Sequence, residues 1–138
     1  MGGVIFFPLW TLEDGSNIIR LFPLHCTVIS NNETVTQYFP YSVCAILSIT
    51  SCTLAIIEIT KFENRMLQLK LGALNSLVTT IAIVLSTYFI INLIEKYNSG
   101  GQYGLAVWIM VVALLGNMIA GRLIRRDEKL VNESERLR

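Results

Sequence analysis

The side chains of this sequence that could act as nucleophiles, bases or metal ligands are one histidine, His25, and three cysteines, Cys26, Cys44 and Cys52. His25 and Cys26 are neighbours, but adjacent side chains normally diverge, so this pair does not form a catalytic dyad. Cys44 and Cys52 lie eight residues apart in one apolar run, and the roughly 12 Å of helix rise between them is beyond the reach of a disulfide. No spacing of cysteine and histidine matches a zinc site. We therefore expect three small apolar cysteines, no metal and no cofactor.

Motifs of the common enzyme classes are absent from the sequence. It has no serine-hydrolase elbow, no zinc-protease motif, no phosphate-binding glycine loop and no dinucleotide fingerprint. An ion-coupled carrier would need charges or interrupted helices near the middle of the membrane, and the long apolar runs contain neither a central charge nor a proline. The net charge of +1 gives no reason to expect nucleic acid as a partner. The sequence thus predicts a protein that is not an enzyme.

Three long uncharged runs indicate the elements that must position these residues. Hydrophobic residues make up 53% of the sequence and charged residues 15%, whereas soluble domains carry about 25% charged residues. A helix needs about 20 apolar residues to cross the hydrocarbon of a membrane. We predict a single domain of the all-α class, an antiparallel bundle of transmembrane helices at residues 41–60, 69–93 and 103–124.

The segment before the first complete span is expected to hold a partial helix and a loop. Residues 4–10 are apolar but too short to span, so we predict that residues 1–10 are the remnant of a first transmembrane helix whose earlier part is missing, or else a segment lying in the interface. Residues 11–39 contain most of the turn-forming residues and are expected to be an extracytoplasmic loop. Within that loop, β-branched residues on both sides of Asn31 and Asn32 favour a small β-hairpin.

Small residues recur at helical spacing along each predicted span and indicate faces on which helices pack closely. The third span also carries Asn117, whose amide must be hydrogen-bonded in hydrocarbon and is therefore expected to face another helix rather than lipid. The predicted packing residues are Ala45, Ser48, Cys52 and Ala55 in the first span, Gly72, Ser76 and Thr80 in the second, and Gly116, Asn117 and Ala120 in the third.

Glu58 lies one turn before the charged end of the first span and three residues before Lys61. At this spacing on a helix, the two side chains can form an ion pair. Long charged side chains near the ends of membrane helices also reach toward water. We therefore expect Glu58 to be solvated or paired with Lys61 rather than to be a buried functional carboxylate.

Basic residues are concentrated in two segments and predict the orientation of the chain. Loops rich in lysine and arginine stay in the cytoplasm, and the other two connections have only Arg20 and Lys96. We predict a multi-pass protein of the inner membrane, with residues 11–39 outside and a cytoplasmic tail, residues 125–138, that lies as a helix along or below the headgroups. The basic residues that set this topology are Lys61, Arg65 and Lys70 between the first two spans, and Arg122, Arg125, Arg126, Lys129, Arg136 and Arg138 after the third.

Two charged motifs resemble signatures of a known family. They are RMLQLKL at residues 65–71 and DEKLV at residues 127–131, the latter followed by Ser134, Arg136 and Arg138. The family comprises the small integral membrane proteins called domain of unknown function 4293, found in Bacteroidota, and residues 6–9 look like the end of that family's first helix. The resemblance covers essentially the whole chain and implies a four-helix membrane protein with both termini in the cytoplasm, although the family's basic start and most of its first helix are missing here. It implies no activity and no catalytic residue.

These observations favour an interaction protein. We expect a non-catalytic accessory or scaffold subunit that packs through its helices and its basic tail, with other integral membrane protein subunits and membrane lipid as partners. The alternative is a binder of a lipid or small apolar molecule in a pocket between the helices near Ser76, Thr80 and Asn117. An enzyme that acts through His25 or Cys26 is the least supported class.

Overall fold

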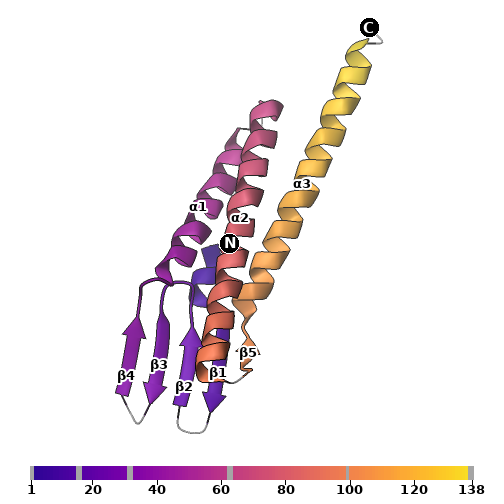
Figure 1. Cartoon of the computed structure of the whole chain (residues 1–138). Helices are drawn as coiled ribbons and strands as arrows, with labels where there is room; N and C mark the ends of the chain where they lie inside the picture. Colours follow the sequence, from indigo (N-terminus) through magenta and orange to yellow (C-terminus); the bar gives the residue numbers. More distant parts are fainter. Residues whose placement is uncertain (1, 15–16, 31–32, 62–63, 99, 137–138) are drawn as a thin grey trace.

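Figure 1 shows the computed structural model of the chain, which describes residues 2–14, 17–30, 33–61, 64–98 and 100–136. The fold has a five-stranded antiparallel sheet and three long helices, preceded by a 3-10 helix, η1 (Gly2–Phe6). It is therefore a mixed structure of strands and helices, and the predicted all-α class is wrong. The sheet lies at one end of the molecule, and the helices extend away from it (Figure 1).

The sheet is a meander built almost entirely from the segment that the sequence predicts to be a loop. Ser30 in the third strand lies opposite Glu33 in the fourth, so the predicted hairpin is present, although its turn residues, 31–32, lie outside the described part of the chain. The strand order is β4-β3-β2-β1-β5. The strands are β1 (Trp10–Asp14), β2 (Asn17–Leu21), β3 (Cys26–Ser30), β4 (Glu33–Gln37) and the short β5 (Gln102–Tyr103).

Alternating burial explains why the first two strands form. Trp10, Leu12, Ile19 and Leu21 are buried on one face, whereas Arg20 is exposed on the other. Side chains of a strand point alternately to the two faces of its sheet, so an antiparallel sheet can bury one face and leave the other exposed. Because each strand is short, the alternation is a weak signal in the sequence.

The core lies where the buried face of the sheet meets the second half of α2 (Arg65–Tyr97) and the start of α3 (Leu105–Arg136). Trp10 is fully buried there, and its Nε1 donates a hydrogen bond to the carbonyl oxygen of Gly100, 3.2 Å away. Gly101 has a φ of +54°, and a Cβ at this position would collide with the Trp10 ring. This hydrogen bond and this close contact hold the connection between α2 and α3 against the first strand. The buried apolar residues of this core are Val4, Leu9, Trp10, Leu12, Ile19, Leu21, Cys26, Ile90, Leu93, Ala106 and Met110.

The helices α1 (Ser42–Thr60), α2 and α3 are all long and apolar enough to cross a membrane. α2 begins earlier than the predicted span. There the Asn64 side chain caps the helix by accepting a hydrogen bond from the backbone N–H of Leu67, 3.1 Å away. α3 continues without a break through the predicted tail to Arg136.

α2 is the central helix, and both α1 and α3 pack against it (Figure 1). η1 contacts both α1 and α3 close to the sheet. Farther from the sheet α3 diverges from α2, and its last turns extend beyond the ends of α1 and α2 (Figure 1). The three helices are thus joined through the sheet and η1 at one end and through direct helix contacts toward the other.

Candidate functional site

Three buried polar side chains join α1 to α2 inside the apolar segments. Ser51 Oγ donates a hydrogen bond to Asn75 Oδ1, 2.6 Å away, and lies 3.0 Å from Thr79 Oγ1. All three residues are buried. In hydrocarbon an unsatisfied hydroxyl or amide is unfavourable, so polar groups that satisfy one another hold neighbouring helices together.

Asn117 joins α3 to α2. Its Nδ2 donates hydrogen bonds to the carbonyl oxygen of Gly72, 3.0 Å away, and to Ser76 Oγ, 2.7 Å away. The amide therefore faces another helix, as we expect for an asparagine within an apolar run. Thr80, which belongs to the same predicted face as Gly72 and Ser76, is exposed and bonds to the backbone of its own helix.

Glu58 is buried between these contacts, although the sequence predicts it to be solvated. Only 7% of the residue is exposed, and within the described residues no group pairs with its carboxylate. Lys61 is exposed and forms no ion pair with it there, so the predicted pair is wrong. A Cβ at residue 72 would lie 2.8 Å from Glu58 Oε1. The absence of a side chain at Gly72 is what allows the carboxylate to turn inward.

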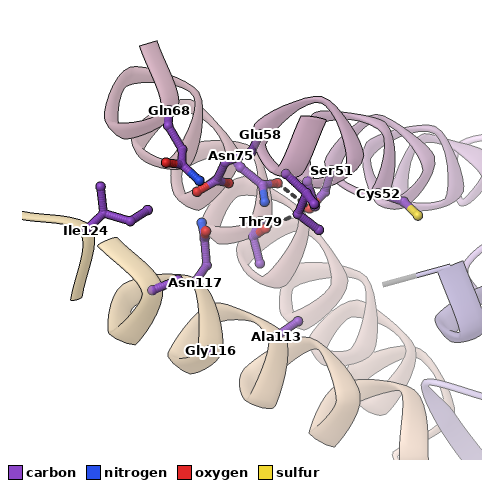
Figure 2. A pocket seen from close by; sticks show the side chains of 13 residues that line it. Ser51, Cys52, Glu58, Gln68, Asn75, Thr79, Ala113, Gly116, Asn117 and Ile124 are labelled. Atoms are coloured by element: carbon purple, nitrogen blue, oxygen red, sulfur yellow. Dashed lines mark hydrogen bonds between the residues drawn. The ribbon is translucent and has the colours of Figure 1, made fainter. Parts of the chain in front are cut away.

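Two cavities meet at Glu58 and Asn117. The first, between all three helices, has a volume of about 350 Å³, and the second, which reaches the later part of α3, about 340 Å³. Figure 2 shows Glu58, Asn75 and Asn117 gathered around the first cavity, one from each helix. An unpaired carboxylate at the junction of two cavities is accessible to a ligand. The polar lining of the first cavity is Ser51, Glu58, Gln68, Asn75, Thr79 and Asn117; that of the second is Glu58, Ser76, Asn117, Arg122 and Arg125.

The small residues predicted for helix packing lie mostly along these cavities. A Cβ added to Gly116 would meet nothing within 4 Å, so this residue makes no tight contact with another helix. Ala45 and Ser48 are buried in the first half of α1, where the Ala45 N–H donates a hydrogen bond to the carbonyl oxygen of Pro23. The first cavity is lined by Cys52, Ala55, Gly116, Asn117 and Ala120, and the second by Gly72, Ser76 and Asn117.

Three residues of the site, Ser51, Asn75 and Thr79, are not among the predicted packing residues. The predicted face of α2 repeats every four residues, and this spacing rotates by about 40° around the helix at each step. A spacing that alternates between three and four residues stays on one face and would have identified them. The buried residues of α2 that follow this spacing are Gly72, Asn75, Thr79, Ala82 and Ser86.

Both basic segments lie at the end of the helices away from the sheet (Figure 1). Lys61 and Lys70 are exposed on either side of the connection between α1 and α2, and α2 begins at Arg65. On α3, Arg122 and Arg125 line the second cavity. The other predicted basic residues are Arg126, which is exposed, Lys129, whose Nζ lies 3.8 Å from Glu133 Oε1, Arg136 at the end of the helix, and Arg138, which lies outside the described residues.

Cys26 is the first residue of β3 and His25 directly precedes it, and neither lines a cavity. Burial raises the pKa of the Cys26 thiol, and the positive charge of Lys96 partly offsets this effect. A thiol with a raised pKa carries little thiolate at neutral pH and is a poor nucleophile. His25 Nδ1 is buried without a hydrogen-bond partner in the described structure, and its ring stacks on Phe22 with centroids 5.0 Å apart. Among all the residues that the structure describes, no group of three or more His, Cys, Asp or Glu could hold a metal ion.

Comparison with known proteins identifies a family. The model of the family described as domain of unknown function (DUF4293) matches residues 1–137. No curated protein and no solved structure matches the chain. The matched residues include the sheet, all three helices and the lining of both cavities.

Proposed function

The chain belongs to the DUF4293 family, as its two charged motifs predict, and we propose that it is a non-catalytic membrane protein that binds a lipid between its helices. Three of its helices are long and apolar enough to span a membrane. The proposal depends on Glu58, whose buried carboxylate has no partner among the described residues and lies where two cavities meet. The sequence favours an accessory subunit and gives lipid binding as the alternative; the cavities support the alternative more strongly.

The lining of the cavities suits a molecule with a polar head and an apolar chain. Their volumes of about 350 and 340 Å³ fall within the usual range of ligand sites. Ile59, Ala113 and Ile124 form an apolar wall in the first cavity. Glu58 and Asn117 supply polar atoms to both cavities. Asn117 already donates two hydrogen bonds to α2, whereas the Glu58 carboxylate has no partner among the described residues, which is unfavourable at this depth.

In the proposed orientation the site lies at the cytoplasmic side of an inner membrane. Basic residues next to membrane spans are retained in the cytoplasm. Lys61, Lys70 and Arg122 lie at the same end of the helices as the two cavities. The sheet then lies on the outer side, and the charged last turns of α3 lie in the cytoplasm.

Filling the first cavity tests the proposal. Gly116→Phe places a ring where a Cβ meets nothing within 4 Å. Leu115→Phe is the matched control, because Leu115 is exposed and lines neither cavity. After extraction with a polymer that retains native lipid, we expect native mass spectrometry to find bound lipid on the wild type and on the control, and little on Gly116→Phe. Equal retention by both variants, or a wild type without lipid, contradicts the proposal.

An accessory subunit is the second candidate, and the exposure of α3 favours it. In the most apolar stretch of α3 only 6% of the residues are buried, compared with 28% of the residues in the corresponding stretches of α1 and α2. A transmembrane helix of a partner protein could cover α3 and the first cavity together, with the small residues allowing a close approach. In that case Gly116→Phe releases a protein of fixed stoichiometry from the purified complex, rather than a lipid.

A further inference from the structure

Charges of both signs line the second cavity. Glu58 supplies a carboxylate from α1, and Arg122 and Arg125 supply guanidinium groups from α3. No ion pair joins Glu58 to either arginine in the described structure. The negative and positive groups therefore lie on different helices, on the lining of a cavity of about 340 Å³.

A cationic hydrogen-bond donor stabilises the ionised form of Glu58. Taking a carboxylate out of water is unfavourable by several kcal/mol unless it is paired. The nearby lysines in the sequence, Lys61 and Lys70, are exposed and form no ion pair with it among the described residues. A primary ammonium group carries three N–H donors on a compact centre. Such a group fits a space in which Ser76 and Asn117 also present polar atoms.

Arg122 and Arg125 are suited to a phosphate. They are three residues apart on α3, so their side chains lie on one side of the helix. A guanidinium group binds phosphate oxygens through two parallel hydrogen bonds. Both arginines follow the uncharged run that ends at Gly121, which is the depth at which headgroups meet hydrocarbon.

The cavity lining argues against two other kinds of lipid. Quaternary ammonium groups such as choline are bound in cages of aromatic rings, and none of the described residues that line the two cavities is Phe, Tyr or Trp. A headgroup with only negative charge would satisfy the arginines but would leave Glu58 beside a like charge. A headgroup with a primary ammonium and a phosphate pairs its positive group with Glu58 and its negative group with the two arginines.

We propose that the second cavity binds the headgroup of a phospholipid of the phosphatidylethanolamine class. Its ammonium donates hydrogen bonds to Glu58, and its phosphate accepts them from Arg122 and Arg125. The acyl chains extend along the first cavity toward Ala55 and Ala113, away from the basic end of the helices. This assignment rests on the proposed lipid-binding function and adds to it the class of lipid.

A comparison of headgroups on the wild-type, full-length chain tests the assignment. Delipidated protein is mixed with dioleoyl phospholipids that carry ethanolamine, N-methylethanolamine, N,N-dimethylethanolamine, choline or glycerol, and bound lipid is measured by native mass spectrometry. We expect ethanolamine to bind about tenfold more tightly than choline or glycerol, the effect of one charge-assisted hydrogen bond, and each N-methyl group to weaken binding. Equal affinities, or a preference for glycerol, overturn the assignment and leave the proposed function standing. Failure of every lipid to bind overturns both.

Variants then separate the two halves of the headgroup. Glu58→Gln preserves the size of the side chain and removes its charge, so the preference for ethanolamine over glycerol should disappear. The double variant Arg122→Gln, Arg125→Gln should weaken binding of both lipids. Arg126→Gln is the control, because Arg126 follows Arg125 directly and is exposed, as Arg122 and Arg125 are, but lines neither cavity. A preference for ethanolamine that survives in Glu58→Gln overturns the role of Glu58. The N-methyl series needs only the wild type, so it decides the question even where a variant does not fold.

Discussion

Glu58 and Gly72 show how one residue without a side chain can decide the environment of another. Glu58 has an oppositely charged residue, Lys61, three positions away on its own helix, yet it turns toward α2 and is 7% exposed. It does so because Gly72 leaves room for its carboxylate. Exposed ion pairs on a helix contribute only about 0.3–0.5 kcal/mol, so the local pair is too weak to hold Glu58 at the surface.

Cys26 is a second residue whose chemistry depends on the fold. Burial raises the pKa of its thiol, so the folded state binds this proton more tightly than the unfolded state does. The resulting stability is present below the ordinary pKa of cysteine and is lost as the pH rises through the raised pKa. We expect the wild type to lose stability from neutral to alkaline pH in SDS unfolding titrations, and Cys26→Ala to lose less. Cys52→Ala, at a half-buried position beside the first cavity, is the control that should behave as the wild type. An equal loss in Cys26→Ala contradicts the prediction.

At the scale of elements, α1 and α2 are joined by a polar stripe inside apolar helices. Ser51 contacts both Asn75 and Thr79, which lie one turn apart on the face of α2 that packs against α1. Apolar contacts do not favour helix association in lipid as they do in water, because the acyl chains are equally apolar. Hydrogen bonds between the helices therefore contribute specificity that a run of leucines would not.

Replacing Thr79 by Val tests this contribution. The change keeps the shape of the side chain and removes its hydroxyl, which lies 3.0 Å from Ser51 Oγ. We expect a loss of about 0.6 kcal/mol in the free energy of unfolding, the average for hydrogen bonds between membrane helices, and at most about 1.7 kcal/mol. Thr80→Val is a matched control on the next residue, because Thr80 is exposed and bonds only within its own helix. The outcome that contradicts the role of the stripe is an equal loss in both variants, measured by SDS titration.

The whole molecule is polarised along its helices. The sheet and the apolar core lie at one end, and the basic residues and the two cavities lie toward the other (Figure 1). The strands have one exposed face, and β4 at the edge of the sheet is exposed along its length. Such an element is compatible with water and not with hydrocarbon, where an open sheet edge leaves backbone groups unsatisfied. The membrane is therefore expected to surround the helices and to exclude the sheet.

Labelling of intact cells tests this orientation. Thr34→Cys places a thiol on exposed β4, and Lys70→Cys places one at the exposed start of α2. A thiol reagent that does not cross membranes should label Thr34→Cys in intact cells and should label Lys70→Cys only after lysis, because basic loops remain in the cytoplasm. The wild type, with its three buried or half-buried cysteines, gives the background. Labelling of Lys70→Cys from outside contradicts the orientation.

The sequence by itself determined the three apolar helices and the family, because hydropathy runs and short charged motifs are local properties of the chain. It also predicted the hairpin at residues 31–32, whose strands are adjacent in sequence. Only the tertiary structure decided the complete sheet. In it β1 pairs with β5, which follows α2 in the sequence, and this pairing depends on how α1 and α2 pack and bring the end of α2 back to the first strand. The same reason applies to the site: the burial of Glu58 is set by Gly72, on the next helix, and no pattern within α1 contains that information.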